Sequence, residues 1–465
     1  MSIMRGYFLP HPPLAVPEVG RGREREIQDT LDALDEVAKE IATLAPETII
    51  YITPHSTVYA DYFLISPGTK AKGDLANFGA GHVKFQVEYD RDLVYEIAAS
   101  ANQDEILAGD IGEEDASLDH GTMVPMWFID QRYKDYKVVR ISPSGMTSGE
   151  HYHFGMSIAK GVERAGRKVV LVASGDLSHK LTQSGPYGYA MEGEIFDQTI
   201  TTVLTYGDYL PLLLTADSLR SAAAECGFNS LAIMAGCFDR QKVETKLYSY
   251  EGPFGVGYAV GSVAPAGQDP NRNFLDKLVQ IMAKNAALKK RKEHSYQQLA
   301  RKSLEHRVKT GEELKVPDGL PMELLNNRAG VFVSIYKNDR LRGCVGTIAP
   351  TTASIASEII QNAVSAGMYD NRFDQVKASE LDELTYNVDV LSPPEEIASI
   401  RELDVKKYGV IVTKGMKRGL LLPDLNGIDT VEEQVAIAKQ KAGISEREKV
   451  KLERFLVTRY GQEEE

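Results

Sequence analysis

Three stretches of the chain share one pattern: a short apolar run, then a proline or glycine, then a histidine. The pattern occurs at residues 3–9 followed by His11, residues 48–53 followed by His55, and residues 169–174 followed by His179. Short runs rich in Val, Ile and Tyr that stop at Pro or Gly are typical of buried strands. In an open α/β sheet, ligands bind beyond the carboxyl ends of the strands. We therefore predict one shared site at this edge, and a metal-centred one, because imidazole is the commonest metal ligand.

Bulk composition narrows the class of protein. A length of 465 residues is enough for two or three domains, and 43% hydrophobic with 26% charged residues is typical of a globular fold. The net charge of −13 argues against nucleic acid as the main partner, because a phosphate-binding surface needs a basic stripe. No run approaches the roughly 18 apolar residues of a membrane span, and no secretory leader is recognisable. With three cysteines and no C-x-x-C spacing, we expect a cytoplasmic protein.

The first half of the chain alternates strand-like and helix-like segments. Residues 1–265 are therefore expected to form an α/β domain with a mixed, mostly parallel sheet flanked by helices. Apolar residues at steps of three and four predict an amphipathic helix over residues 21–44. Further strands are expected at residues 62–66, 138–141 and 255–263, and further helices at residues 92–101, 152–165, 189–206 and 219–235.

The second half of the chain has a different pattern of strand-like and helix-like segments. A polar, Pro- and Gly-bearing stretch at residues 264–273 marks the predicted domain boundary. Residues 266–289 are assigned to a linker and the start of a connecting helix, and a charged helical stretch is expected over residues 274–310. Residues 330–425 contain short β-like runs separated by glycine turns, which predicts that residues 290–465 form an α+β domain with an antiparallel sheet.

Four of the nine histidines have strong local contexts. His11 lies between prolines, so its backbone is stiff and not helical. His55 follows a proline at a strand end, and His120 lies in the turn-like segment Leu-Asp-His-Gly. His179 follows an aspartate and a serine that could orient its ring. A single such histidine is more often structural, but three of them at strand ends favour a joint site.

A mononuclear iron site of the two-histidine, one-carboxylate type also needs an acid, and leaves open positions for substrate and dioxygen. Spacing alone does not select one among 66 acidic residues. Glu225 is the best candidate, because Ala-Ala-Ala-Glu-Cys-Gly places it in a small, apolar, helix-like stretch where a buried carboxylate needs a metal or hydrogen bonds. The alternative is an acid near a helix terminus.

Taken together, these segments resemble a known family. The motifs P-H-P-P, I-T-P-H-S, L-D-H-G-T-M-V-P, S-G-D-L-S-H and E-C-G occur in the order found in class III extradiol ring-cleavage dioxygenases, catalytic B subunit (LigB-like), and in the related Memo family. The resemblance covers residues 1–265. It implies that iron is bound by His11, His55 and Glu225, that His179 is the catalytic base, and that His120 lines the pocket and assists.

The resemblance implies oxidative cleavage of a catechol-like substrate with Fe(II) and dioxygen. The metal would lower the pKa of a bound phenol and hold both reactants together. His179 would take a phenolic proton, and His120 would donate to the developing oxyanion. Zinc or copper could occupy the same residues.

Residues 290–465 resemble the AMMECR family. The matching segments include L-R-G-C-V-G-T, D-N-R-F, Y-N-V-D-V-L-S-P-P-E and K-R-G-L-L-L-P-D, with Val345 where the family usually has Ile. The resemblance names a domain but no reaction. Cys344, flanked by glycines and close to Arg342, is a candidate nucleophile or ligand-binding residue. The alternative is a small buried residue in a tight strand and turn.

Three functions remain open at this point. The first is a dioxygenase-type enzyme. The second is a Memo-like module that binds a metal or a peptide, favoured by the fused second domain and by the lack of the small helical subunit that closes the pocket in ring-cleaving relatives. A metal-assisted hydrolase is a distant third, because nothing supplies a dedicated oxyanion hole. The fusion also implies a radical-SAM protein as partner, and the oligomeric state is left open.

Overall fold

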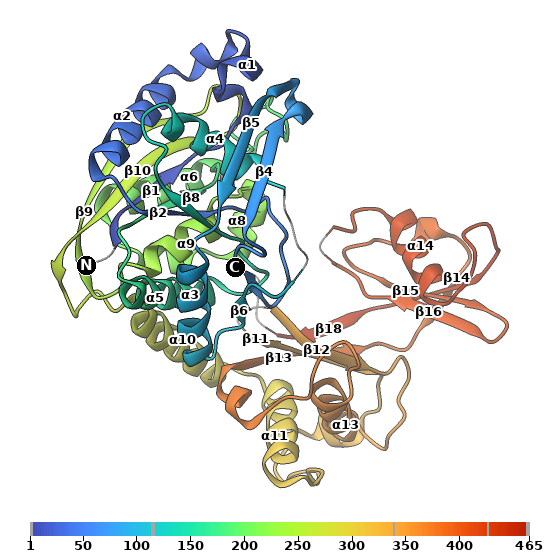
Figure 1. The fold of residues 1–465 in the computed structure, drawn as a ribbon. Helices are drawn as coiled ribbons and strands as arrows, with labels where there is room; N and C mark the ends of the chain where they lie inside the picture. The colour runs from blue at the N-terminus through green and yellow to red at the C-terminus, as the bar shows by residue number, and fades with distance from the viewer. Residues whose placement is uncertain (1–2, 113–116, 338–339, 426, 462–465) are drawn as a thin grey trace. The chain divides into compact units, whose positions relative to one another are not determined.

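The computed structural model describes residues 3–112, 117–337, 340–425 and 427–461 (Figure 1). The chain forms two compact units, Met1–Val279 and Gln280–Glu465. The division falls inside helix α10 (Phe274–Arg291). None of the helices in the described ranges is long and apolar enough to cross a membrane.

A six-stranded sheet forms the centre of the N-terminal unit, in the order β7-β2-β8-β1-β10-β9. Its strands are β1 (Ile3–Leu9), β2 (Thr48–Ile52), β7 (Lys137–Ile141), β8 (Val169–Ser174), β9 (Gln241–Glu251) and β10 (Tyr258–Gln268). The first four in spatial order are parallel, and the last two pair antiparallel. The predicted mixed, mostly parallel sheet is confirmed.

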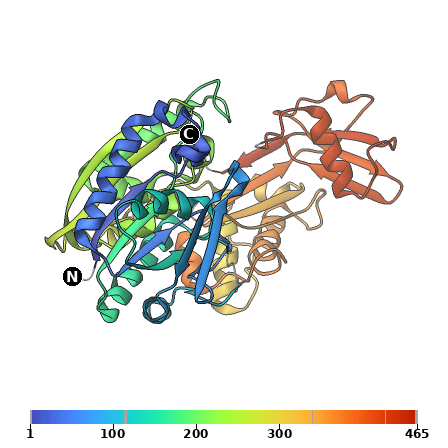
Figure 2. The ribbon, with the colours of Figure 1, turned by 45° about the horizontal axis from the view of Figure 1, so that its top comes forward.

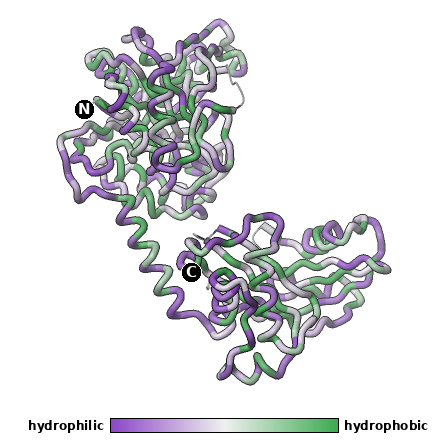
Figure 3. The backbone as a smooth tube through the Cα atoms, turned by 60° about the horizontal axis from the view of Figure 1, so that its bottom comes forward, coloured by the Kyte–Doolittle hydropathy of each residue, from purple (hydrophilic) through white to green (hydrophobic). Residues whose placement is uncertain are grey.

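Helices cover both faces of this sheet (Figures 1 and 2). The helices are α2 (Gln28–Leu44) and α4 (His120–Asp130) on one face, and α3 (Arg91–Gln103), α5 (Ser148–Ala165), α6 (Met191–Tyr206) and α9 (Phe228–Gly236) on the other. Because side chains alternate along a strand, Ile49 and Tyr51 belong to one core and Ile50 and Ile52 to the other. Strands buried on both faces read as continuous apolar runs, and Figure 3 shows hydrophobic backbone concentrated inside each unit.

Two predicted segments differ from the structure. Within residues 21–44, where one helix was expected, the chain forms a 3-10 turn at Arg23–Ile27 followed by α2, and a separate short helix, α1 (Pro17–Gly20), precedes this range. The stretch expected to break after residue 263 continues as strand β10. Beyond Val263 this strand has β9 as its only partner among the described strands, so Pro265 lies where a missing N–H is tolerated.

The predicted helix over residues 219–235 is also interrupted. It forms α8 (Asp217–Ala223) and α9, and Ala224 adopts a left-handed backbone with φ of 53°. The interruption contains Glu225 and Cys226, so both lie in a turn and not on a helix face. This break decides which side chain faces the site described below.

Several smaller elements of the N-terminal unit were not predicted. Strands β4 (Lys70–Leu75) and β5 (Ala80–Glu88) form a separate antiparallel hairpin, joined through η3 (Ala76–Phe78). Strand β6 (Ala108–Gly109) and helix α7 (Leu210–Leu214) were not predicted either. The partner of β6 is β3 (Phe63–Leu64), which lies within the strand expected at residues 62–66. The hairpin presents polar side chains on one face, which weakens its hydrophobic signal in the sequence.

The C-terminal unit contains two four-stranded sheets, β12-β11-β13-β18 and β14-β17-β15-β16, in which all described pairings are antiparallel. This confirms the predicted antiparallel α+β class. The strands are β11 (Val331–Lys337), β12 (Arg340–Gly346), β13 (Leu384–Leu391), β14 (Glu395–Ile397), β15 (Gly409–Lys414), β16 (Lys417–Leu421), β17 (Lys451–Phe455) and β18 (Val457–Tyr460). The helices are α11 (Ser295–Thr310), α12 (Met322–Asn326), α13 (Ile355–Met368) and α14 (Val431–Lys441).

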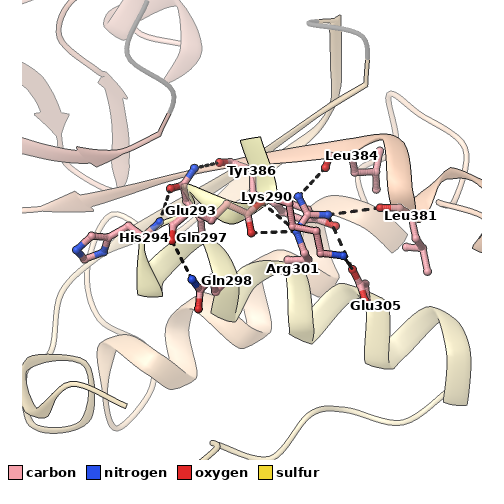
Figure 4. Close-up of polar contacts among 10 residues, drawn as sticks. All are labelled: Lys290, Glu293, His294, Gln297, Gln298, Arg301, Glu305, Leu381, Leu384 and Tyr386. Atoms are coloured by element: carbon pink, nitrogen blue, oxygen red, sulfur yellow. Dashed lines mark hydrogen bonds and ion pairs between the residues drawn. The ribbon is translucent and has the colours of Figure 1, made fainter. Parts of the chain in front are cut away.

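A buried ion pair fixes helix α11 to strand β13 (Figure 4). Arg301 and Glu293 are 4% and 9% exposed, and the Arg301 Nε donates to both carboxylate oxygens at 3.0 Å. The same guanidinium donates to the Leu384 carbonyl at 2.8 Å, and the Gln297 amide donates to the Tyr386 carbonyl at 2.8 Å. These bonds satisfy polar groups that would otherwise be costly to bury.

Candidate metal centre

The three strands that precede His11, His55 and His179 are adjacent in the sheet. Strands β2 and β1 both flank β8, and all three are parallel, so their carboxyl ends meet at one edge. The rings of His11 and His55 have centroids 4.7 Å apart, His11 and His120 5.2 Å, and His55 and His120 4.2 Å. The structure thus gathers His120, from the start of α4, into the same cluster.

His11 is the most constrained of these rings. Its backbone N–H donates to Asp176 Oδ1 at 2.9 Å, and its Nδ1 lies 2.8 Å from the hydroxyl of Ser174. That hydroxyl donates its own hydrogen bond to the Gly121 carbonyl at 2.5 Å, so it accepts a hydrogen bond from Nδ1–H of His11. The remaining lone pair of His11 is therefore on Nε2, as a metal ligand held by an outer hydrogen bond requires.

Three donor atoms converge on one point. The Nε2 of His11 lies 3.0 Å from the Nε2 of His55 and 3.6 Å from the Sγ of Cys226. All three donors lie within 4.8 Å of one another. Ligand bonds of about 2.1 Å to nitrogen and 2.3 Å to sulfur separate two nitrogens by about 3.0–3.4 Å, and nitrogen from sulfur by about 3.6 Å. The residues therefore fit a single transition-metal ion.

Cys226 reaches this cluster because two glycines pack backbone to backbone. A Cβ on Gly175 would lie 2.0 Å from the Cα of Gly227, so no side chain fits there. The N–H of Gly227 donates to the Asp176 carbonyl at 3.0 Å, and the N–H of Asp176 donates to the Cys226 sulfur at 3.3 Å. Burial raises the pKa of the Cys226 thiol, which the neighbouring Asp176 reinforces.

Glu225, the predicted carboxylate ligand, points elsewhere. Its carboxylate accepts from the Nε of Arg220 at 3.0 Å and from the backbone N–H of Phe228 at 2.7 Å. The Arg220 guanidinium stacks 3.9 Å above the Phe228 ring. Glu225 therefore pairs with Arg220 of α8 and with the first N–H of α9, and the group of converging donors contains Cys226 in its place. A ligand role for Glu225 stays a prediction.

His120 is the first residue of α4 and not part of the loop turn that we predicted. Asp119 caps this helix, accepting from the Thr122 N–H at 3.0 Å and from the Thr53 hydroxyl at 2.6 Å. Phe78 packs edge-on against His120, with centroids 5.5 Å apart. Burial, and then the neighbouring imidazole of the site, lower the pKa of His120 to about 4.

His179 is held by the backbone that follows β8. Its Nδ1 lies 3.1 Å from the Leu177 carbonyl, which can only accept, so Nδ1 carries the proton. Burial lowers the pKa of His179, although the carbonyls of Leu177 and Ala224 oppose this effect. The exposed ring of Tyr187 lies edge-on to His179 at 5.6 Å. Burial also lowers the pKa of His11 and His55, so the cluster is uncharged at neutral pH.

Asp197 fixes the segment that carries His179. One of its oxygens accepts from the N–H of Ser178 at 2.8 Å, and the other accepts from the Tyr250 hydroxyl at 2.8 Å. A Cβ on Gly257 would lie 2.1 Å from the Asp197 carboxylate, so this position needs glycine. Burial raises the pKa of Asp197 to about 7.

A cavity of about 800 Å³ adjoins His55 and His120. Its volume lies in the range of about 300–1,000 Å³ that is usual for small-molecule sites. The other lining residues are Lys72, Gly73, Asp74, Asn77, Phe78, Lys84, Phe85, Gln86, Ser117, Leu118, Asp119 and Met123. The β4–β5 hairpin and the beginning of α4 thus form its walls.

Comparison with known proteins identifies both units. Residues 5–261 match the family of the catalytic LigB subunit of aromatic ring-opening dioxygenase. The chain belongs to this family. Residues 297–463 match the AMMECR1 family, so the chain combines a LigB-type unit with an AMMECR1-type unit. This confirms the fusion that the sequence motifs indicated.

Relatives of the fused chain and of its parts are known. A Clostridium acetobutylicum protein, CA_C1420, is 42% identical over 99% of both chains, so it shares this architecture. A Thermotoga maritima protein is 51% identical over 36% of this chain and 98% of its own length. The crystal structure of PH0010 from Pyrococcus horikoshii, 34% identical, covers 35% of this chain and 88% of its own, with a TM-score of 0.33. None of these names states an activity.

The LigB-type unit has two site residues that the motif analysis did not select. Cys226 supplies the third donor, and Ser174 orients His11. The feature of the sequence that could have indicated Cys226 is Gly227, which follows it. A glycine after two polar residues often marks a place where two backbones approach closely. No comparable signal singles out Ser174, which is the last residue of an apolar strand.

In the AMMECR1-type unit, the surroundings of Cys344 differ from expectation. The guanidinium of Arg342 donates to both oxygens of Glu380 at 3.1 Å. The Ser334 hydroxyl donates to the Cys344 sulfur at 3.2 Å, and Arg372 donates to the Cys344 carbonyl at 3.1 Å. The cation beside Cys344 is thus Arg372, and Arg342 is engaged with a carboxylate.

Proposed function

We propose that the LigB-type unit is a non-haem Fe(II) oxidoreductase of the extradiol-dioxygenase type, acting on a catechol-like aromatic diol. The observation that supports this most strongly is the convergence of His11, His55 and Cys226 beside His120 and a cavity of about 800 Å³. Two imidazoles and a thiolate suit a transition metal and not Mg²⁺ or Ca²⁺, which prefer oxygen donors. Membership of the LigB family favours iron among these metals.

The bound metal would supply Lewis acidity that lowers the pKa of a phenol and brings the reactants together. The protein supplies the remaining functions. With its Nδ1–H donated to the Leu177 carbonyl, His179 offers Nε2 as acceptor for a phenolic proton. His120, held at the capped start of α4, would donate a hydrogen bond to the oxygen that becomes negative. Phe78 and Phe85 contribute apolar surface to the wall of the cavity.

One observation favours a second function. The third donor is the sulfur of Cys226, and thiolates suit zinc and copper at least as well as a dioxygen-activating iron site. The LigB-type unit would then be a Memo-like metal-binding module without turnover. In that case the AMMECR1-type unit would provide the surface for a radical-SAM partner.

Metal content and turnover decide between the two functions. We would purify the wild type, His55→Ala and His179→Ala without oxygen, and measure metal by plasma mass spectrometry. We expect one equivalent of iron in the wild type and in His179→Ala, and little in His55→Ala. A panel of catechols with dioxygen should then give ring-cleavage products with the wild type alone.

The other outcomes are equally informative. A full complement of zinc or copper with no ring cleavage supports the binding module. Metal loss in His179→Ala contradicts its role as base. Metal-free wild type, even after reconstitution, rules out both functions.

A further inference from the structure

We propose that the chain forms a symmetric dimer in which strand β9 of one copy pairs antiparallel with β9 of a second copy, so that two six-stranded sheets become one. This inference goes beyond the proposed function and does not depend on the metal centre. It rests on the open edge of the N-terminal sheet and on the order of charges along that edge.

The two edges of the six-stranded sheet differ. At the β7 edge, flanking segments continue the backbone pairing: the N–H of Asp90 donates to the Val138 carbonyl, and the N–H of Ser66 donates to the Arg140 carbonyl, both at 2.9 Å. At the other edge, β9 pairs with β10 alone among the described strands. Figures 1 and 2 show β9 at the outside of the N-terminal unit. Within the part of the chain that the structure describes, the β9 edge is therefore the one open to a further strand.

The backbone of β9 is suited to such pairing. The strand has 11 residues, whereas strands usually have about five or six. Pro265 has no N–H to donate to Val243, its neighbour on β9, which favours a ladder to β10 carried by the alternate residues of β9. The N–H and C=O groups of Val243 and Thr245 then point away from β10. A row of such groups at an edge is a template for another strand.

The charges along β9 alternate in sign. Lys242, Glu244 and Lys246 are exposed, and they share one face of the strand because side chains alternate. The ammonium of Lys246 lies 2.7 Å from the carboxylate of Glu36 on α2. Among the described residues, neither Lys242 nor Glu244 has an ion-pair partner. Glu244 is thus available to a cation on a second chain.

One register of a β9–β9 pair satisfies both faces of the strand. With the twofold axis at Thr245, Glu244 of each copy lies opposite Lys246 of the other. On the other face, Val243 lies opposite Leu247, and both are partly buried apolar residues of β9. With the axis at Glu244 or at Lys246, that residue lies opposite itself, and directly opposed like charges are destabilising. The sequence therefore selects the register centred on Thr245.

The alternative is that the charges of β9 protect the edge. Charged side chains, and lysine above all, often keep an edge strand from pairing with another chain. A set of like charges would repel a second copy in every register, whereas the alternating order on β9 permits one. Reversal of single charges distinguishes the two explanations, because it should weaken a dimer and should have no effect on the mass of a protected monomer.

The test measures the mass of the full-length protein by sedimentation velocity over a series of concentrations. The variants are Glu244→Lys, Lys246→Glu and the double exchange Glu244→Lys/Lys246→Glu. The control is Glu88→Lys, which makes the same change of charge at an exposed residue of β5. Thermal melting confirms that each variant is folded. We expect the wild type and the control to be dimers, and each single variant to dimerise at least about tenfold more weakly, because two attractive pairs become repulsive.

Two combinations test the register itself. The double exchange again places a lysine opposite a glutamate, so it should recover the dimer. In a mixture of Glu244→Lys with Lys246→Glu, a mixed dimer also has opposite charges at both positions. The mixture should therefore dimerise, although neither variant does so well alone.

Three results would overturn the proposal. The first is a wild type that stays monomeric at the highest concentration measured. The second is a dimer that survives both single reversals, or that is weakened equally by Glu88→Lys, since its contact then lies elsewhere or responds to net charge alone. The third is a loss in the single variants that neither combination recovers, because residues 244 and 246 are then not opposite each other.

Discussion

The Nε2 atoms of His11 and His55 lie 3.0 Å apart, although 44 residues separate them in the chain. Strands β1 and β2 bring them together, because both pair in parallel with β8. Burial keeps both imidazoles uncharged, so they do not repel each other. The sheet thus assembles two nitrogen donors before any ion binds, which reduces the ordering needed on binding.

Replacing Cys226 or Glu225 shows which residue is the third ligand. We expect Cys226→Ser to lower the metal affinity of the protein at least about tenfold, because the sulfur lies in the donor cluster. Glu225→Gln should retain the metal and lose about 1–3 kcal/mol of stability, because Arg220 would then keep only Asp217 of its two carboxylate partners. Competition with a chelator and thermal melting measure the two effects. The reverse pattern would restore Glu225 as the ligand.

Ser174→Ala tests the orientation of His11. The hydroxyl accepts from His11 Nδ1 and donates to the Gly121 carbonyl, so its removal frees the ring to rotate or change tautomer. Loss of an outer hydrogen bond of this kind typically lowers metal affinity about 10–100-fold. Ser100→Ala is the control, because this serine is also buried but belongs to α3. Equal affinity in both variants would show that Ser174 does not orient His11.

Asp197 predicts a pH dependence of stability. Its folded pKa of about 7 is above the ordinary value of 3.8, so between these values the folded state binds a proton that the unfolded state has released. Stability therefore falls as the pH rises from about 4 to about 7, by up to about 4 kcal/mol from this group, and is then constant.

The variant Asp197→Asn removes this titration. Its melting temperature should rise relative to that of the wild type between pH 5 and pH 7.5. Asp29→Asn, on an exposed face of α2, should track the wild type at every pH. A difference between wild type and Asp197→Asn that does not vary with pH would contradict the raised pKa.

In the AMMECR1-type unit, Arg301→Met should destabilise α11. Glu293 would remain buried without its cation, which typically costs about 3–5 kcal/mol. Hydrogen exchange of α11 peptides provides a local measurement. Lys290→Met, which removes an exposed partner of Glu305, should change stability by less than about 1 kcal/mol. Adding Glu293→Leu to Arg301→Met should recover most of the loss, since both charges are then gone.

The sheet edge that carries the histidines was largely predictable from the sequence. Strands β2 and β8 are buried throughout and β1 is buried from Gly6 to Leu9, so each contains a largely apolar run that is followed by Pro or Gly. The histidines that follow then had to lie at one edge, whatever the rest of the fold. The order of the LigB-like motifs added His120 to the predicted site. No apolar run precedes this histidine, so the strand pattern alone would have missed it.

The turn at residues 224–227 was not predictable in the same way. Its alanines favour a helix, and the predicted helix over residues 219–235 follows that local preference. The chain breaks there because Gly227 packs on Gly175, a contact between residues far apart in sequence. This contact turns Cys226 toward His11 and leaves Glu225 with Arg220, so the identity of the third donor depends on tertiary packing.

The β4–β5 hairpin forms its own two-stranded sheet, apart from the strands that carry the histidines. The donor atoms and this part of the cavity wall are thus contributed by separate stretches of chain. Insertions or exchanges within residues 70–88 can alter what enters the cavity while the donor atoms stay in place. Exchanging this hairpin would therefore reshape the cavity without replacing any residue of the donor cluster.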